Sequence, residues 1–244
     1  MSEKQFEILA WDSSFFGFST ARILPSRLGA SELGSLLHEL RQNNVKLAYW
    51  AASSPVTFDL NPLGGALVDQ KVTFQADLTR LEPQSSLPID DVQPPSQADL
   101  LSEPFRTALL SLAVQAGEFS RFAMDTHFPR DLFTNLYHEW MRNSLAHDLA
   151  DDVLVIQIAQ LPVGMVTVRQ KDTAGEIGLI AVHPDWRGKH YGEKLVRAAQ
   201  LWASRRGLTI ARVVTQARNL PACRLYEKCG YHLESTEYFH HFWL

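Results

Sequence analysis

The sequence is poor in cysteine and has no long apolar run, and these two shortages narrow the class of protein. Cys223 and Cys229 are its only cysteines in 244 residues. So few thiols in a long chain predict reduced side chains in a cytoplasmic protein, not a disulfide-linked scaffold. No run of 18 apolar residues occurs, so we expect no membrane-spanning helix, and the first residues lack the apolar core of a signal peptide.

Positive charge is also scarce. The chain has 23 Lys and Arg against 27 Asp and Glu, a formal net charge of -4. Proteins that bind nucleic acid through its phosphates usually carry a basic excess, so this balance argues against a general nucleic-acid binder. Hydrophobic residues make up 45% and charged residues 20% of the chain, which is typical of a packed globular protein with one large or two small domains.

A change of composition suggests where the chain divides. Residues 82–96 are rich in Pro, Ser and acidic side chains and have little periodicity, which predicts a linker. We therefore expect an N-terminal α/β domain over 1–82, a linker over 83–97 and a second domain over 98–244.

Hydrophobic spacing predicts the elements of both parts. In the first, we expect a helix over 32–42 capped by Ser31 and a loop over Asp12–Gly17, with strands over 6–11, 19–24, 45–52 and 70–78. In the second, we expect helices over 102–117, 131–146, 193–206 and 219–228, with strands over 153–159, 164–169, 176–182, 209–215 and from Tyr231 onward.

Several smaller features accompany these elements. Leu161-Pro162 and residues 172–175 predict turns between the meandering strands. Leu132, Leu136 and Trp140 are interpreted as the buried face of a helix. His240-His241 lacks metal-site spacing with any partner and is interpreted as a solvated edge.

The segment from Leu179 to Gly192 is the most informative part of the chain. An apolar run enters a turn marked by Pro184, and a short basic loop with glycine then leads into a helix start. Backbone amides in such a loop and in the first helical turn lack internal partners, and the helix dipole adds positive potential. The pattern predicts a cradle for phosphate or pyrophosphate.

Two common nucleotide sites fit this cradle poorly. A Rossmann site needs G-x-G-x-x-G with a later acidic residue, and a P-loop ends in Gly-Lys-Ser/Thr. Only Gly188 and Gly192 are present, and no Gly-Lys-Ser/Thr follows. Both NAD and ATP are therefore disfavoured.

Two sequence blocks resemble the GNAT superfamily of acyl-CoA N-acyltransferases. Arg187–Gly192 is similar to that family's coenzyme A pyrophosphate loop, R/Q-x-x-G-x-G/A. Asn219–Tyr231 resembles its second signature, in which Asn opens a helix that ends in Tyr-Glu-Lys-x-Gly-Phe/Tyr. His190 departs from the pattern, because it stands where the loop has its first glycine, which lets the backbone approach phosphate. It is either an imidazolium partner of phosphate or a surface histidine at a helix start.

The resemblance implies a fold and a reaction. The fold is an α/β (α+β) GNAT fold, a mixed central sheet with helices on both faces, preceded by a smaller, partial GNAT-like N-terminal domain. The reaction uses acetyl-CoA as cosubstrate and no metal, and a neutral amine attacks the thioester directly. The acceptor would be a small amine.

The same resemblance implies roles for particular residues. The backbone N–H near Val182 would stabilise the oxyanion, Tyr226 would protonate the departing thiolate, and Glu176 would act as a base through water. Their structural alternatives are a core tyrosine and a surface glutamate at a strand end. The residues implied to contact the coenzyme are Ile180, Ala181, Val182, Arg187, Gly188, Lys189, His190, Tyr191, Gly192, Asn219, Ala222 and Leu225.

Further segments resemble family members that act on nucleotide-linked amino sugars in bacterial surface-polysaccharide synthesis. They are Leu9–Gly17, Ser120–Phe122, Leu136–Trp140, Val214–Gln216 and Glu234–Tyr238. The implied acceptor is an amino sugar carried by a dTDP nucleotide, and the candidate substrate residues are Arg121, His127, Tyr137 and Phe16. The structural alternatives are a surface arginine at Arg121 and a core or interface residue at Phe16. The planar fork of Arg121 suits a diphosphate.

Other functions and assemblies stay open at this point. The acceptor could be another small amine or a protein N-terminus, and a non-catalytic acyl-CoA-binding module would keep the cradle without the chemistry. A homodimer is also open.

Overall fold

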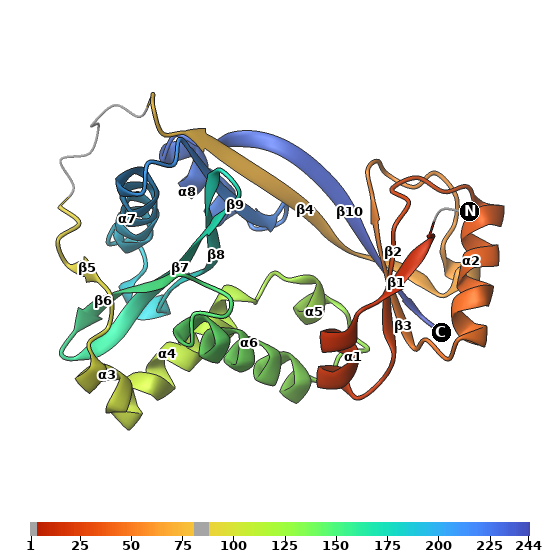
Figure 1. The fold of residues 1–244 in the computed structure, drawn as a ribbon, viewed down its shortest axis with the longest axis horizontal. Helices are drawn as coiled ribbons and strands as arrows, with labels where there is room; N and C mark the ends of the chain where they lie inside the picture. Colours follow the sequence, from red (N-terminus) through yellow and green to blue (C-terminus); the bar gives the residue numbers. More distant parts are fainter. Residues whose placement is uncertain (1–3, 81–87) are drawn as a thin grey trace.

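A mixed β-sheet forms the frame of the molecule (Figure 1). The computed structural model describes residues 4–80 and 88–244, and within them the sheet has ten strands in the order β1-β2-β3-β10-β4-β9-β8-β7-β6-β5. The pairs β2–β3 and β8–β9 are parallel, and the other neighbours are antiparallel. The strands are β1 Phe6–Ile8, β2 Thr20–Ile23, β3 Leu47–Ala52, β4 Gly65–Asp77, β5 Val92–Gln93, β6 Asp152–Ile158, β7 Leu161–Lys171, β8 Ala174–Val182, β9 Ile210–Gln216 and β10 His232–Trp243.

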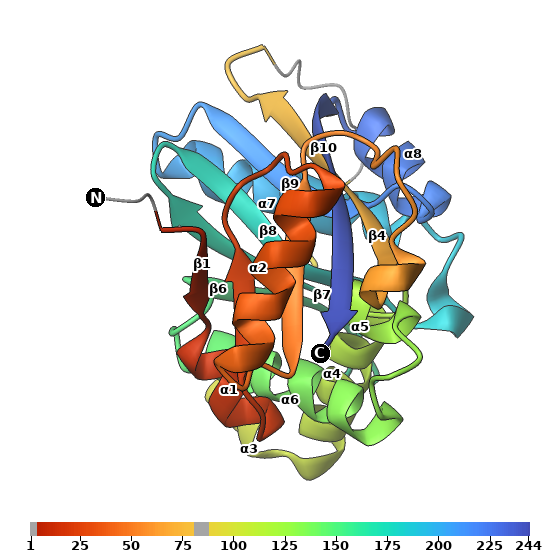
Figure 2. The same cartoon turned by 90° about the vertical axis from the view of Figure 1, so that its right-hand side faces the viewer.

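Helices cover both faces of this sheet, as predicted. Figure 1 shows α7 and α8 on one face and α4 and α6 on the other, while α2 covers the end formed by β1, β2 and β3 (Figure 2). Among the described residues, no helix is long and apolar enough to cross a membrane. The helices are α1 Ala10–Phe16, α2 Ala30–Gln42, α3 Gln97–Leu101, α4 Glu103–Ala116, α5 Arg121–Met124, α6 Arg130–Leu145, α7 Tyr191–Arg205 and α8 Leu220–Lys228.

Each face of the sheet has its own hydrophobic core. On one face, Leu195 and Trp202 of α7 pack with Tyr226 of α8 against the central strands. On the other, Phe105 of α4 and Leu136 of α6 pack against β6 and β7. The helical spacing of the apolar residues explains this arrangement, because positions three and four apart share one face of a helix. Leu136 is fully buried, as predicted, whereas Leu132 and Trp140 are partly buried beside it.

The sheet runs across the predicted domain boundary. Strand β4 precedes the predicted linker, yet it lies between β9 and β10 and pairs with both. The division into two domains stays a prediction, but the two parts share one continuous sheet. Figure 1 shows the long β4 and β10 joining them side by side.

The linker prediction is wrong for part of its range. Residues 81–87 lie outside the described residues, but Val92 is buried in β5, which pairs with β6. Ser96 then caps α3, because its hydroxyl accepts from the amide of Asp99 and the Asp99 carboxylate accepts from the amide of Ser96. This Ser-x-x-Asp capping box is a helix-start signal that the composition of the segment obscured.

Three local predictions near turns also fail. The segment predicted as a loop over Asp12–Gly17 is mostly helix α1, which ends where Gly17 adopts a left-handed φ of 75°. Gly29 rather than Ser31 caps α2, since the Glu32 carboxylate accepts from the Gly29 amide at 2.7 Å. Leu161-Pro162 begins β7, and the turn lies just before it, at residues 159–160 with positive φ values.

The solvated edge predicted at His240-His241 is wrong. Strand β10 lies between β3 and β4, so both of its sides are paired. His240 and His241 are only 3% and 1% exposed. The Nδ1 atom of His241 lies 2.6 Å from Oδ2 of the buried Asp125, and Trp243 Nε1 donates to the same oxygen at 2.9 Å.

Candidate active site

The two central parallel strands separate toward their carboxyl ends. Strands β8 and β9 are in register from Ala174 with Ile210 to Ile177 with Val213, and both continue beyond that point. Strand β8 is irregular there, and the amide of Leu179 donates to the hydroxyl of Thr167 at 2.8 Å. Such a bulge bends its strand away from its partner. A gap therefore opens in the middle of the sheet.

Backbone amides of β8 face this gap. The amide of His183 donates to the carbonyl of Val163 on β7 at 2.8 Å, and that of Leu179 also points to β7. Because successive amides of a strand point to opposite sides, those of Ile180 and Val182 point toward the gap. The oxyanion role predicted near Val182 remains a prediction, but this amide has the direction that the role requires.

The predicted anion cradle begins where β8 ends. The helical turn Pro184–Trp186 follows the strand, and Arg187 is anchored because its Nε donates to the carbonyl of Val182 at 3.0 Å. Among the described residues, the backbone amides from Gly188 to Glu193 donate to no recorded acceptor. Unpartnered amides at a helix N-terminus are a fitting site for an anion such as pyrophosphate.

His190 has a backbone conformation that favours glycine. Its φ is 64° and its ψ is 7°, in the left-handed region, and it is the N-cap of α7. Histidine is among the non-glycine residues that adopt this region more often than most. Its side chain turns to Glu193, with Nδ1 3.3 Å from Oε2, and Glu193 also accepts from Lys228 Nζ at 2.6 Å. His190 thus adopts the left-handed conformation that a glycine in this position could also adopt.

The second sequence block lies directly against the first. Asn219 caps α8, because its Oδ1 accepts from the amide of Ala222 at 3.3 Å. A Cβ atom built on Gly192 would be 3.1 Å from Leu225 Cδ2, which shows how closely the starts of α7 and α8 approach. The structure therefore brings together the two blocks that the resemblance paired, although the individual coenzyme contacts stay predictions.

A cavity of about 650 Å³ connects the two faces of the sheet at the gap. Asn219, Ala222 and Tyr226 line it from α8, and Ile180 and Thr215 line it from the separating strand ends. Tyr226 packs on Phe74 of β4, at 5.9 Å between ring centroids. Since side chains alternate along a strand, Asp69 and Lys71 of β4 line the cavity from the opposite face. Ser120, Arg121, Tyr137 and Trp140 line that side from α5, α6 and the segment before α5.

Tyr226 is in the protonation state that a proton donor needs. It is 2% exposed, and burial raises the pKa of its phenol above the usual value. The phenol is therefore protonated at neutral pH. It is a core tyrosine that also lines the cavity, so its position is compatible with both interpretations of the sequence. Its catalytic role stays a prediction.

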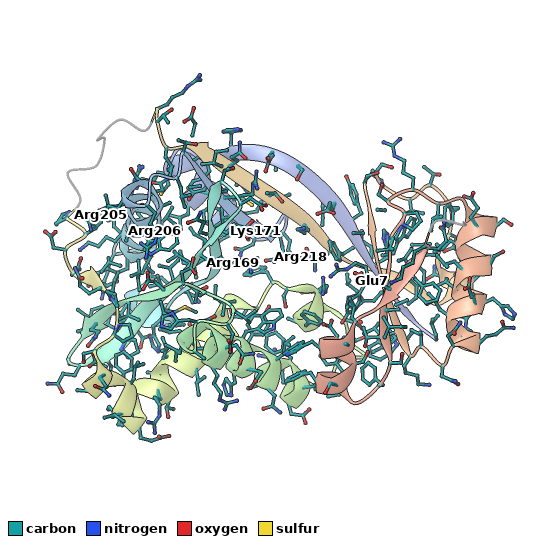
Figure 3. All side chains as sticks on the ribbon, in the orientation of Figure 1. Glu7, Arg169, Lys171, Arg205, Arg206 and Arg218 are labelled. Atoms are coloured by element: carbon teal, nitrogen blue, oxygen red, sulfur yellow. The ribbon has the colours of Figure 1, made fainter. Side chains whose placement is uncertain are left out.

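Glu176 is held outside this cavity by two cations. Its Oε2 accepts from Arg169 at 3.1 Å, and its Oε1 lies 3.7 Å from Lys171 Nζ. Arg169 and Lys171 are labelled in Figure 3. Glu176 lines a neighbouring groove instead. To act as a base it would have to leave this ion pair, so the geometry gives the predicted role little support.

The candidate substrate residues are divided by the structure. Arg121 and Tyr137 line the cavity, and burial raises the pKa of Tyr137 to about 12. Phe16 is buried elsewhere, with its ring 6.0 Å from that of Phe122. His127 has an exposed side chain that lies 3.0 Å from Asp125. Neither Phe16 nor His127 is among the residues that line the cavity.

Sequence reasoning missed the lining residues from outside the second domain. Arg22, Tyr49, Asp69 and Lys71 precede the predicted linker, yet all of them line the cavity. Asp69 had only a weak signal, because it follows the apolar run Ala66–Val68 but is itself followed by the polar Gln70 and Lys71. Nothing in the local sequence shows which cavity such a residue faces.

Asp69 is the most unusual ionisable group in the cavity. It is 6% exposed, and its Oδ1 has no hydrogen-bond partner in the described part of the chain. Burial raises the pKa of this carboxyl to about 6, although the positive charges of Arg218, Arg121 and Lys71 act in the opposite direction. The rise in the pKa of Asp69 is thus mainly an effect of desolvation.

Comparisons with known proteins assign the family. The model of the acetyltransferase (GNAT) family matches residues 113–231. The chain is 30% identical over 235 residues to the dTDP-fucosamine acetyltransferase of Escherichia coli O6:H1 strain CFT073, covering 95% of each chain. It is 27% identical over 157 residues to the spore coat polysaccharide biosynthesis protein SpsD of Bacillus subtilis strain 168, covering 64% of this chain and 52% of that protein. The chain belongs to the GNAT family of acetyltransferases.

A solved structure agrees with this fold. The GCN5-related N-acetyltransferase from Sphaerobacter thermophilus superposes with a TM-score of 0.59 at 16% identity, covering 97% of this chain and 75% of that one. At this identity the likeness concerns the fold alone. Family and fold together confirm the expectation of an N-acetyltransferase enzyme.

Proposed function

We propose that this enzyme transfers the acetyl group of acetyl-CoA to the amine of a nucleotide-linked amino sugar, by direct attack of the amine on the thioester. One observation carries the proposal: a single cavity at the gap is lined by Tyr226 of α8 on one face of the sheet and by basic and aromatic side chains on the other, and the amide-rich cradle begins where β8, which bounds the gap, ends. The two substrates can then enter from opposite faces and meet at the gap.

The donor side has groups that fit acetyl-CoA. The amides from Gly188 to Glu193, which have no partner among the described residues, would hold the pyrophosphate, and the close approach of Gly192 to Leu225 supports α8 residues as its neighbours. The thioester supplies the acetyl group. The Val182 amide, which faces the gap, would donate to the carbonyl oxygen as its negative charge grows. Tyr226 would give its phenolic proton to the departing sulfur.

The acceptor side has groups that fit a sugar nucleotide. Arg22, Lys71, Arg121 and Lys171 line this part of the cavity and would favour a diphosphate. The guanidinium of Arg121 lies 4.5 Å from the centroid of the Tyr49 ring and 5.0 Å from that of Phe239. Cation–π packing holds its planar fork in place. The name of the dTDP-fucosamine relative supports the same class of acceptor.

Two alternatives are less well supported. A protein N-terminus or a simple amine would not need the cluster of cations on the acceptor side. A non-catalytic acyl-CoA-binding module would not need an acceptor chamber at all. The basic side chains on the acceptor side therefore favour the sugar nucleotide over both.

Release of free thiol from acetyl-CoA tests the proposal. Acceptors would include dTDP-linked 4-amino-4,6-dideoxyhexoses, the corresponding free amino sugars, short peptides and polyamines. We expect kcat/KM to be at least about 100-fold higher for a dTDP-linked sugar than for the free sugar. Equal rates with and without the nucleotide would reject the proposed acceptor.

Arg121 provides a sharper version of this test. In Arg121→Met, KM for the sugar nucleotide should rise about tenfold or more, which is the loss expected for one charge-assisted contact to phosphate. KM for acetyl-CoA should stay within about twofold. Arg41→Met, at an exposed position of α2 far from the cavity, is the matched control.

A further inference from the structure

We propose that Asp69 binds the ammonium group of the acceptor and takes its proton. This inference rests on the proposed function, since it assigns a residue to the acceptor half of the same cavity. It places the base on β4, in the N-terminal part of the chain, and not on β8, where Glu176 was the candidate.

The position of Asp69 fits this role. Lys71 pairs with Gln216, the last residue of β9, and the carbonyl of Gln70 accepts from the amide of Ala217 at 2.8 Å. Asp69 therefore lies just past the end of β9, beside the gap between β8 and β9. It lines the cavity on the side opposite Tyr226. An amine held there would face the thioester from the acceptor side.

Asp69 is also available to bind a ligand, unlike the carboxylates near it. Glu237 accepts from Lys71 Nζ at 2.6 Å, and Glu176 is held by Arg169. Asp69 has an Oδ1 that is shielded from solvent and has no hydrogen-bond partner among the described residues. A buried acceptor without a donor costs free energy unless a ligand supplies one. An ammonium group has three N–H donors and a positive charge, so it meets this need.

Within residues 4–80 and 88–244, no cation forms an ion pair with Asp69. Arg218 donates to the carbonyl of Val68 at 3.2 Å, and the guanidinium of Arg121 is packed on aromatic rings. Lys71 is bound to Glu237. Tyr137 also faces this part of the cavity, with its phenol neutral. These groups leave the Asp69 carboxylate free to receive a new donor.

Burial raises the pKa of Asp69 to about 6, against the effect of the nearby cations. At pH 7 to 8 the carboxyl is then ionised, yet it is a stronger base than an exposed aspartate. A general base works best when its pKa is close to the operating pH.

The proton transfers balance as follows. Asp69 takes one proton from the acceptor ammonium, and the freed lone pair of the nitrogen forms the new C–N bond. As the C–S bond breaks, Tyr226 gives its proton to the sulfur, and the nitrogen loses a second proton that restores the phenol. The products are the acetamide and the thiol, and Asp69 releases its proton to solvent.

Asp69→Asn tests the assignment, with Glu176→Gln as the rival variant and the exposed Asp148→Asn as control. We expect Asp69→Asn to lower kcat/KM for the acceptor by about 100-fold or more at pH 7, with the affinity for acetyl-CoA unchanged. The acid limb of the kcat/KM profile near pH 6 should disappear. Asp69→Glu should keep the limb and restore part of the rate.

Several outcomes would overturn the assignment. One is an Asp69→Asn enzyme with kcat/KM within about threefold of wild type and the same acid limb. A second is loss of the limb in Glu176→Gln, and a third is a parallel loss of acetyl-CoA binding in Asp69→Asn, which indicates a structural role. Failure of the proposed acceptor looks different, because wild type would then release thiol with another amine, on which the same variants are compared.

Discussion

The buried carboxylate of Asp69 should lower the stability of the folded enzyme at neutral pH. The ordinary pKa of 3.8 rises to about 6 on folding, so the charged form is disfavoured in the folded state. Below pH 3.8 both states are protonated and there is no cost. Between pH 3.8 and 6 the folded state holds a proton that the unfolded state has lost, so stability falls as pH rises. Above pH 6 the cost is constant.

The loss of stability caused by Asp69 can be calculated from the same rise in its pKa. A difference of about 2.2 pH units at 1.36 kcal/mol per unit gives about 3 kcal/mol above pH 7. At pH 4.5 the cost is about 1 kcal/mol by the same linkage relation. Asn has nearly the shape of a protonated Asp and carries no charge. Asp69→Asn should therefore be more stable than wild type by about 3 kcal/mol at pH 7.5 and by about 1 kcal/mol at pH 4.5.

Thermal and urea unfolding at several pH values would measure this difference in stability between Asp69→Asn and wild type. For a chain of this size, about 3 kcal/mol corresponds to an increase in Tm of about 6–12 °C at pH 7.5. Asp148→Asn, at an exposed position, should change Tm little at either pH. An Asp69→Asn protein that is no more stable than wild type, or whose gain does not depend on pH, would refute the reasoning. A variant that is more stable but inactive is the pattern expected for a strained functional residue.

Three further predictions concern other parts of the site and core. Tyr226→Phe should lower kcat by about 10–100-fold with unchanged acetyl-CoA affinity. Tyr231→Phe is the control, because its ring is buried 5.9 Å from that of Tyr226, and it should leave kcat unchanged. If both variants lost kcat equally in a stopped assay, Tyr226 would no longer be assigned as the acid. His190→Gly should keep the coenzyme A affinity within about threefold by calorimetry, because the backbone already has a glycine-like φ of 64°, and a tenfold loss would show that the imidazole binds phosphate. Burial lowers the pKa of His241 even though Asp125 accepts its hydrogen bond; the folded state then resists a proton that the unfolded state takes up below its ordinary pKa of 6.5, so stability should fall as pH falls below that value, and His241→Gln should flatten this slope in denaturant titrations.

Local patterns allowed much of the fold to be predicted from the sequence. The helix over 191–205 and the strand before it follow from apolar spacing and from glycines, which are local properties. The interpretation of His240-His241 failed because exposure depends on which strands lie on either side of β10, and its partners β3 and β4 are far away in the sequence. The linker prediction failed for a similar reason, because Val92 pairs with β6, a strand that lies far away in the sequence.

The sequence by itself determined the two blocks around Arg187 and Asn219, because an anion cradle needs only a short loop, a helix start and a glycine-like backbone, all of them encoded within a few residues. Only the tertiary structure decided which groups face the reaction. The gap depends on the separation of β8 from β9, and the acceptor chamber depends on the insertion of β4 and β10 beside them. Asp69 acquires its raised pKa and its place opposite Tyr226 from that long-range pairing, because burial and neighbouring charge are properties of the assembled sheet and not of the strand that carries the residue.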